Sequence, residues 1–567
     1  MNDRTKTGLE ILKVAVGMGI LGDVLLRSVP WGLNVLMFNV AFAAGMFMLL
    51  KRRAPERLTT QTLAPLGGLV FFASMFVVRD SIQLRIFDTL AIIGLLGIVF
   101  LPATGVAAKT AGLFHYLVGA LWSGVNAMFA PAMLLSSDIE WKGMPNTGWR
   151  KHTFAVLRGV ALVTPLILIF GALFVAADAA YEGWVQRVLN IDPATVFTHL
   201  LLFSLFAWLS AGYLRGVLMT APIPVEVFVS PIPPAADESP VTLNSRTVVE
   251  HLNISDPPNA TEEKTEEKTE TKKSWSWQDL NNSILPSAFT LGSVEVGVIL
   301  GLMNLLFLSF VIVQIPYLFG GFELVQNTPD FKLAEYARRG FGELVAVSGL
   351  VLPVLLIGHW LIRKDSLFAH KLFRVLAGLQ IGLLFVIMAS AVQRLVVLTG
   401  PLGYGMTTVR LYPMIFMAWL AIVFVWFGAT VLRNARTYFA WGALWSAFLV
   451  LGMTHVLNPD AFIVDTNVAL MREGRDFDAG YSMELSADAV PALLSALPEM
   501  NLESRCATKV NLHIKYRELG GTNDLRTLNW SRRSAWHLLH QNDAIIHQVD
   551  ECPQWVQDNL KLDEANE

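Results

Sequence analysis

Residues 411–432 read LYPMIFMAWLAIVFVWFGATVL, 22 positions without one charged side chain. About 20 apolar residues in an α-helix cross a hydrocarbon layer about 30 Å thick, so this stretch predicts a membrane-spanning helix. Lipid offers no partner for open backbone groups, and nothing in the stretch alternates like a barrel strand. Similar apolar stretches recur along the chain and give eleven predicted spans, over residues 8–26, 31–50, 63–79, 84–102, 152–177, 196–219, 293–315, 341–362, 368–391, 409–432 and 437–457.

The composition of the whole chain agrees with this pattern. Hydrophobic residues make up 54% of the 567 residues and charged residues 16%, against about 45–50% and about 25% in soluble domains. We therefore predict an all-α fold, a polytopic transmembrane helical bundle whose first partner is the lipid bilayer. The formal net charge is only −3. No basic arm or aromatic-basic stripe is present, which excludes nucleic acid as a partner.

Lys and Arg in the short loops predict the orientation, because loops rich in these residues stay in the cytoplasm. Such loops lie at residues 51–57, 150–158, 363–374 and 433–436. The alternation holds only if residues 110–134 do not cross. This segment contains His115, Asn126 and Pro131 among small and aromatic residues, so we predict an interfacial or re-entrant helix. The N-terminus is then inside and the C-terminus outside.

A change in composition divides the membrane part into two halves. Residues 222–284 are rich in Pro, Glu, Thr and Lys, and include TEEKTEEKTETKK at 261–273. Such a segment buries too little apolar surface to fold alone. We predict a disordered cytoplasmic linker, with a partner-docking segment as the alternative. It joins a front membrane half, residues 1–221, to a back half, residues 285–457.

The last part of the chain, residues 458–567, has soluble character. It contains 10 Lys and Arg against 18 Asp and Glu, and its apolar residues recur with helical spacing around 460–471, 486–497 and 531–539. We predict an acidic helical domain outside the membrane. Both cysteines of the chain, Cys506 and Cys552, lie here. An external position allows a disulfide between them, and two free thiols are the alternative.

Few ionisable side chains fall inside the predicted spans, where they are costly and mark candidate functional sites. Asp23 has Arg27 one turn later, and Glu343 has Arg339 one turn earlier. Each is explained either as an ion pair near a membrane face or as part of a transport pathway.

Catalysis finds no support in the sequence. His537 and His540 lie one turn apart on a predicted helix, but without a carboxylate or cysteine partner we favour surface histidines over a metal site. No phosphate-binding loop, nucleophile elbow or zinc motif is present. We predict no catalytic residue, no cofactor and no metal site.

Two stretches are more polar and aromatic than lipid contact requires. They are YGMTTVRLYP at 404–413 and HVLNPDAFIVDTN at 455–467. The simpler explanation is anchoring, since aromatic and Arg side chains favour the headgroup level and Asn-Pro turns the chain. The candidate interface residues are Arg338, Arg339, Tyr404, Arg410, Tyr412, Asn458, Asp460 and Asn467.

These stretches also carry a resemblance to a known family. The segments FGALFVAADAA (170–180), YARRGFGE (336–343), YGMTTVRLY (404–412), NPDAFIVDTN (458–467), LSADAVPAL (485–493) and DLRTLNWSRRSA (524–535) resemble a bacterial membrane-protein family, domain of unknown function 4173, which is akin to the 4153 family. The resemblance implies a multi-pass protein of the bacterial cytoplasmic (inner) membrane. It implies no activity, substrate or cofactor.

Three functions remain open at this stage. We prefer a non-enzymatic envelope protein that senses, scaffolds or regulates, with an envelope protein or a small ligand as its partner. Its external domain would pack on the membrane loops, with Arg338, Arg339, Arg394 or Arg410 facing Asp460, Asp465 or Asp488. The alternatives are a transporter or channel with Asp23 and Glu343 on its pathway, and a membrane enzyme acting on lipid or cell-wall precursors.

Overall fold

A computed structural model describes residues 2–141, 193–220, 290–326, 341–363, 366–400, 404–520, 524–548 and 551–554. Within these ranges the chain is helical throughout. The one strand-like pairing there is an isolated bridge between Leu291 and Ile362. This confirms the predicted all-α fold. The predicted span at 152–177 and the predicted linker at 222–284 lie outside the described residues.

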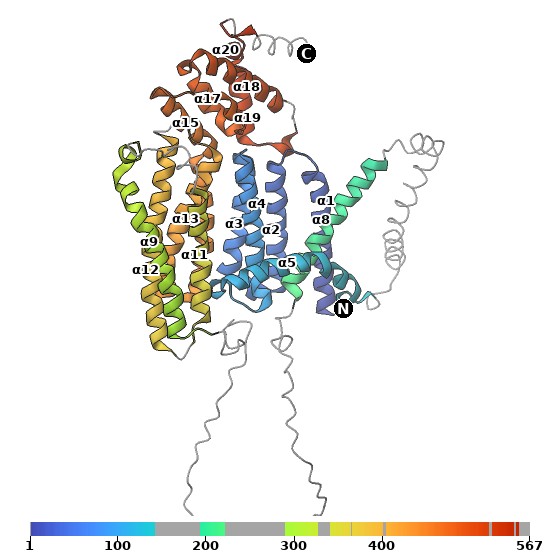
Figure 1. The fold of residues 1–567 in the computed structure, drawn as a ribbon. Helices are drawn as coiled ribbons and strands as arrows, with labels where there is room; N and C mark the ends of the chain where they lie inside the picture. The colour runs from blue at the N-terminus through green and yellow to red at the C-terminus, as the bar shows by residue number, and fades with distance from the viewer. Residues whose placement is uncertain are drawn as a thin grey trace, which may run out of the picture. The chain divides into compact units, whose positions relative to one another are not determined.

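The described membrane part consists of long apolar helices in two groups (Figure 1). The front group contains α1 (Asp3–Leu26), α2 (Leu33–Arg53), α3 (Thr60–Val78), α4 (Ile82–Phe100), α5 (Leu113–Met133) and α8 (Pro193–Met219). The back group contains α9 (Ser293–Gln326), α11 (Phe341–Leu361), α12 (Leu367–Thr399), α13 (Thr408–Thr430) and α14 (Phe439–Leu457).

Ten helices among the described residues are long and apolar enough to cross a membrane, which makes this a multi-pass membrane protein. Nine of them coincide with predicted spans, and the tenth is α5 with the turn that follows it. The predicted span at 8–26 is helical as α1 but is not one of the ten. It carries Glu10, Lys13 and Asp23, which make it less apolar than the others.

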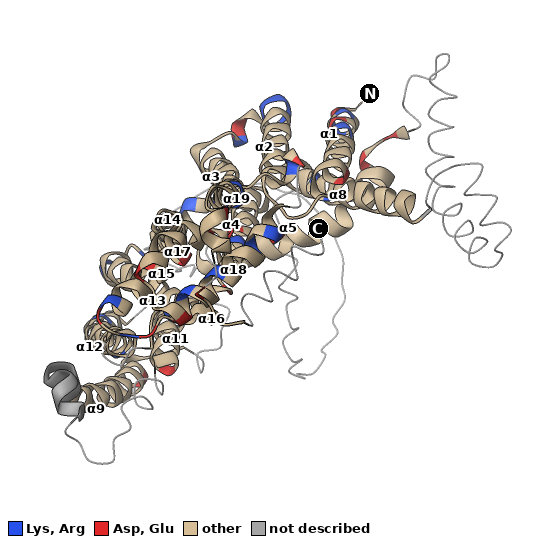
Figure 2. Ribbon diagram, turned by 90° about the horizontal axis from the view of Figure 1, so that it is seen from above, with Lys and Arg blue, Asp and Glu red and all other residues tan. Residues whose placement is uncertain are grey.

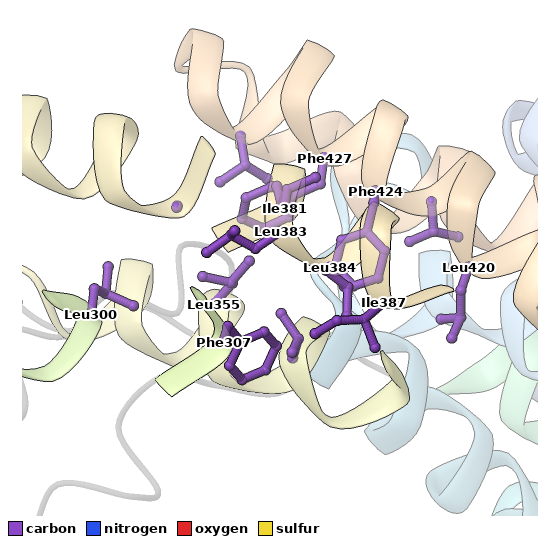
Figure 3. Close-up of a cluster of buried hydrophobic side chains, with 14 of the residues drawn as sticks. Leu300, Phe307, Leu355, Ile381, Leu383, Leu384, Ile387, Leu420, Phe424 and Phe427 are labelled. Atoms are coloured by element: carbon purple, nitrogen blue, oxygen red, sulfur yellow. The ribbon is translucent and has the colours of Figure 1, made fainter. Parts of the chain in front are cut away.

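The two groups pack their helices around separate apolar cores. In the back group, Phe307, Leu355, Leu384, Phe424 and Phe427 meet between α9, α11, α12 and α13 (Figure 3). Large apolar side chains on the outer surfaces, such as Leu305 and Leu306 of α9, stay exposed, as expected of a lipid-facing surface. Long tan stretches in Figure 2 show how little charge the helices carry along their length.

Helix α5 packs beside the ends of three neighbouring helices, and its Met128 carbonyl also accepts a hydrogen bond from Trp208, nearer the middle of α8. Gly119 approaches Leu101 beside the C-terminal end of α4. The backbone of Asn126 and Ala127 approaches Gly212 in the last turns of α8. Leu134, just after α5, packs on Gly8 near the start of α1. Helix α5 is itself among the ten helices long and apolar enough to cross a membrane, so its interfacial or re-entrant placement stays a prediction.

The C-terminal domain is a cluster of shorter helices on its own core. They are α15 (Pro459–Arg472), α16 (Ala479–Ser482), α17 (Val490–Ala496), α18 (Leu502–Gly520), α19 (Trp530–Gln541) and α20 (Asp543–His547), with the 3-10 turns η11 (Ala487–Ala489) and η13 (Leu525–Thr527). Val464, Val490, Leu493, Leu512 and Leu539 are fully buried among them. Helix α17 begins as predicted, because Ser486 caps the preceding turn and Pro491 occupies the first turn.

Candidate functional site

Charged side chains gather where the C-terminal domain contacts the ends of the membrane helices. They come from the α3–α4 turn, the start of α4, the segment before α17 and the start of α19. We call them the charged interface, which consists of Arg79, Asp80, Ser81, Arg85, Ser486, Asp488 and Arg532.

The α3–α4 turn is the membrane side of the charged interface. The apolar run FFASMFVV at 71–78 ends at Arg79, whose extended backbone leaves α3, and α4 begins at Ile82. Only three residues, all polar, separate the two helices. The start of a helix carries backbone amides without intrahelical partners and the positive end of the helix dipole, so a carboxylate is favoured there.

Asp488 of the C-terminal domain supplies that carboxylate. Its Oδ2 accepts hydrogen bonds from the backbone amides of Asp80 at 2.8 Å and Ser81 at 3.0 Å. Ser486 Oγ donates to the same oxygen at 3.1 Å. Arg79 Nη1 lies 3.6 Å from Oδ1, and the Asp488 side chain is almost completely buried. A residue of the C-terminal domain therefore completes the start of a membrane helix.

Asp80 makes the opposite connection, from the membrane turn to the domain. Its Oδ1 accepts from Arg532 Nε of α19 at 2.6 Å and from Arg85 Nη2 of α4 at 2.7 Å. Its Oδ2 accepts a longer bond from the Ala487 amide, at 3.4 Å. Each side of the interface thus has a carboxylate that accepts hydrogen bonds from the other side.

Because these ion pairs are buried, breaking one of them costs more stability than breaking an exposed pair. The side chain of Asp80 is 9% exposed and that of Arg532 is 32% exposed, whereas Arg472 and Glu499 form an ion pair at 61% and 41%. Exposed pairs contribute about 0–1 kcal/mol. Removing one partner of a buried pair costs about 3–5 kcal/mol because a buried charge is left uncompensated. The charged interface therefore holds the domain firmly on the helices.

Asp460 and Asn458 support the domain side of the charged interface. Asp460 Oδ2 accepts from the backbone amide of Ser486 at 2.9 Å. Burial raises the pKa of Asp460 above its ordinary value, and the nearby carboxylates of Asp488 and Asp80 raise it further, although the hydrogen bonds from Ser486 act against them. Asn458 adopts a left-handed backbone with φ +52°, which turns the chain from α14 into α15.

A second buried pair lies one step deeper in the membrane part. His455 Nε2 of α14 is 2.9 Å from Asp88 Oδ1 of α4, and both side chains are at most 3% exposed. The His455 carbonyl accepts from Arg79 Nε at 2.9 Å. The hydroxyls of Tyr412 and Ser81 are 3.4 Å apart. The front and back groups of helices therefore meet directly beneath the charged interface.

The predicted residues Tyr404, Arg410 and Asn467 form a separate support. The Arg410 guanidinium donates to the carbonyls of Tyr404 and Gly405 and lies 6.0 Å from the Tyr404 ring centre. The Asn467 amide exchanges two hydrogen bonds with the backbone of Met406, at 2.6 and 3.0 Å. Gly405 has φ +66°, and a Cβ there would lie 2.8 Å from Asn467 Oδ1. These contacts fix the entry to α13 against α15.

The other predicted charged residues lie apart from the charged interface. Asp23 is 2.6 Å from His199 of α8 and 4.0 Å from Arg27, which includes the expected i,i+4 pair. Glu343 is exposed at the start of α11. Arg338 and Arg339 fall outside the described residues.

The contacts described for Arg394 and Arg410 are with groups other than the predicted Asp460, Asp465 and Asp488, whereas the pairing of Arg338 and Arg339 stays a prediction. Arg394 donates to Gln314 Oε1 at 2.7 Å, and Arg410 binds the backbone as above. The arginine beside Asp488 is Arg79, and the nearest contact of Asp460 is the Ser486 amide. The loop between α3 and α4, which the prediction did not include, supplies the arginine that lies beside Asp488.

The C-terminal domain also contains the cysteines and most of the histidines that the sequence singled out. Cys506 and Cys552 form a disulfide with 5.8 Å between their Cα atoms. His540 stacks on Trp536, and the rings of His513 and His547 are 4.9 Å apart. Over the residues that the structure describes, no group of His, Cys, Asp and Glu is arranged to hold a metal ion.

Sequence reasoning found part of the charged interface and missed its centre. Tyr412, Asn458 and Asp460 were predicted and lie around it. Arg79 and Asp80 were regarded only as the boundary of a span. The available signal was a short turn of three polar residues, Arg79, Asp80 and Ser81, between two apolar helices.

Comparison with known proteins gives the chain a family. A family model with the description Domain of unknown function (DUF4153) matches residues 66–496, more than half of the chain. The chain belongs to this family. No curated protein and no solved structure matches it. The region matched to DUF4153 contains Asp80, Asp88, His455, Asp460 and Asp488, whereas Arg532 and the disulfide lie beyond it.

Proposed function

We propose that this member of the DUF4153 family is a non-enzymatic protein of the bacterial cytoplasmic membrane that senses or regulates through its external C-terminal domain. The observation that supports the proposal is the pair of reciprocal carboxylate contacts at the charged interface. Asp488 of the domain binds the start of α4, and Asp80 of the membrane turn binds Arg532 of the domain.

Such reciprocal contacts suit transmission of a signal. Asp488 also contacts Ser486, next to α17, and Arg79 also binds the carbonyl of His455, at the end of α14. A shift of α17 or α19 on binding a partner would therefore alter the start of α4 and the end of α14 together. Packed elements with hydrogen-bonded charge networks carry energetic coupling of this kind.

The location and orientation of the domain rest on sequence. The Lys and Arg distribution supports a cytoplasmic N-terminus and an external domain. The resemblance to the 4173 family supports a bacterial inner membrane. The partner is an envelope protein or a small ligand that binds the external domain.

Hydrogen exchange of the full chain in lipid nanodiscs tests the coupling. We expect Asp488→Asn to speed amide exchange in α17 and also at Asp80–Arg85, because the loss of a buried charged partner costs on the order of 3 kcal/mol. Asp80→Asn should in turn speed exchange in α17 and α19. Asp465→Asn, an exposed change on α15, is the matched control and should leave both regions unchanged.

Two results would overturn the coupling. One is faster exchange confined to the side that carries the substitution. The other is an equal effect of Asp465→Asn.

A transporter is the second candidate, and one observation favours it. The Gln380 side chain of α12 is fully buried in the back group, and neither of its amide atoms has a hydrogen-bond partner among the described residues. A buried polar group of this kind inside a membrane marks a candidate pathway. Ion flux in reconstituted vesicles above that of empty vesicles, reduced by Gln380→Leu, would favour transport over sensing.

A further inference from the structure

A cavity of about 330 Å³ lies between the C-terminal domain and the turn that joins α1 to α2. Pro30 of that turn forms one side. The end of α18, the η13 turn and the start of α19 form the other sides, with Glu518, Asp524, Leu525, Arg533 and Trp536 among the lining residues. Apart from Arg532, which also lines it, the cavity uses none of the charged interface.

Hydrogen bonds fix the cavity at the ends of the membrane helices. The backbone amide of Leu33, at the start of α2, donates to the Leu528 carbonyl at 2.9 Å. Asn529 Nδ2 donates to the carbonyls of Phe76 and Arg79, at the end of α3, both at 2.8 Å. Gly32 allows the close approach, because a Cβ there would lie 2.3 Å from the Leu528 oxygen. The cavity is therefore level with the membrane surface.

Exposed apolar side chains lie in the lining of the cavity, at Leu525, and next along the chain to the lining residues Pro30 and Asn529. Leu525 is 72% exposed, Trp530 69%, Val29 69% and Trp31 46%. Exposed apolar groups gathered at one place mark an interaction site, and Trp is enriched where protein meets the lipid headgroups. Two of these residues come from the domain and two from the α1–α2 turn. Lipid that covers this rim would contact both parts of the protein.

The charges of the lining leave one cation and one anion without an ion pair. Asp524 is paired with Arg526 at 2.7 Å, and Arg532 with Asp80 at 2.6 Å. Within the described part of the chain, Arg533 and Glu518 form no ion pair with each other or with another residue, and both are exposed. A ligand complementary to this lining carries one negative and one positive group.

We propose that the cavity binds the headgroup of a zwitterionic phospholipid with a primary ammonium group, such as a phosphatidylethanolamine. Arg533 binds the phosphate, and Glu518 binds the ammonium, with the Trp536 ring alongside. The acyl chains continue over Leu525, Trp530 and Val29. A purely anionic lipid would satisfy Arg533 but would leave Glu518 beside a second negative charge. This site does not depend on the proposed function, because it requires only that the domain lies at the membrane surface.

Native mass spectrometry of the purified full chain with equimolar phosphatidylethanolamine and phosphatidylglycerol tests the proposal. We expect the wild type to retain phosphatidylethanolamine preferentially. Glu518→Gln should lower that preference about tenfold, the weight of one charge-assisted contact. Arg533→Gln should weaken retention of both lipids about tenfold, and Arg533→Lys should restore part of it.

Matched controls separate the site from general charge effects. Arg472→Gln and Glu473→Gln make the same charge changes on the same domain, away from the cavity, and should retain both lipids as the wild type does. Trypsin resistance of the domain checks folding, because Arg533 and Glu518 are both exposed and are dispensable for the core. Equal retention of the two lipids by the wild type, or variants that behave like their controls, would disprove the site.

Discussion

At the scale of single residues, Asp80 and Asp488 show how two weak sequence signals become one strong contact. Neither carboxylate lies in a motif, and the two are separated by most of the chain. Together they contact three backbone amides, three arginines from both sides of the interface and Ser486. Each charge is compensated by a group from the other side, so neither the membrane turn nor the domain is complete alone.

Asp460 gives this region a pH dependence with a definite sign. Its folded-state pKa is raised by burial, so ionisation costs folding free energy at pH values above the ordinary Asp range. That cost grows as pH rises and is complete above the raised pKa. We expect Asp460→Asn, which keeps an oxygen for the Ser486 amide, to stabilise the protein relative to wild type at pH 8 and to do so less at pH 4.

Thermal unfolding of the full chain in detergent at pH 4, 6 and 8 measures this difference. Asp465→Asn, on the exposed face of α15, serves as the control and should track the wild type. A difference between Asp460→Asn and wild type that stays constant across the pH range would contradict the assignment.

There is a physical reason why some residues of the charged interface could be predicted from the sequence and others could not. Tyr412, Asn458 and Asp460 stand out because polar groups flank apolar runs there, and the structure places them beside the charged interface. Arg79, which lies beside Asp488, and Arg532, which pairs with Asp80, were missed. Neither composition nor periodicity reports which distant turn a carboxylate will contact. Arg394 and Arg410 were equally plausible cations on the sequence alone.

At the scale of elements, the length of the apolar stretches was enough to predict most of the membrane helices. Predicted spans such as 409–432 and 437–457 correspond closely to α13 and α14. Helix α18 was not predicted, because its buried face includes Cys506, Thr508, Lys509, Asn511 and His513, and its apolar spacing is weak. Burial of this polar face is possible only because neighbouring helices supply partners, as Ala479 does for Asn511. That information is tertiary and absent from local spacing.

Helix α5 yields a prediction about its two ends. Because Gly8, Leu101 and Gly212, which it approaches, lie near the ends of α1, α4 and α8, we expect both of its ends to face the same side of the membrane. Single cysteines at Phe114 and Ser137, in a chain whose native cysteines are replaced by serine, should react with a membrane-impermeant maleimide from the cytoplasmic side only. Labelling of the two positions from opposite sides would make α5 a span and would reverse the loops that follow it.

At the scale of the whole molecule, the redox state of the two cysteines tests the predicted orientation of the C-terminal domain. Cys506 and Cys552 are bridged in the C-terminal domain, and disulfides persist outside the cytoplasm. We expect protein extracted under alkylating conditions to take up label at these cysteines only after reduction. The Cys506→Ser, Cys552→Ser variant should lose about 2–4 kcal/mol of stability in the domain. Full labelling without reductant would place the domain in a reducing compartment and contradict the proposed topology.

The reciprocal carboxylate contacts at the charged interface also have a consequence for the order in which the protein folds during synthesis. Synthesis proceeds from the N-terminus, so the α3–α4 turn emerges long before Asp488 and Arg532 exist. During that interval Asp80 and the free amides at the start of α4 must stay hydrated at the membrane surface. The α3–α4 turn therefore acquires its final contacts only after the last part of the chain has been synthesised.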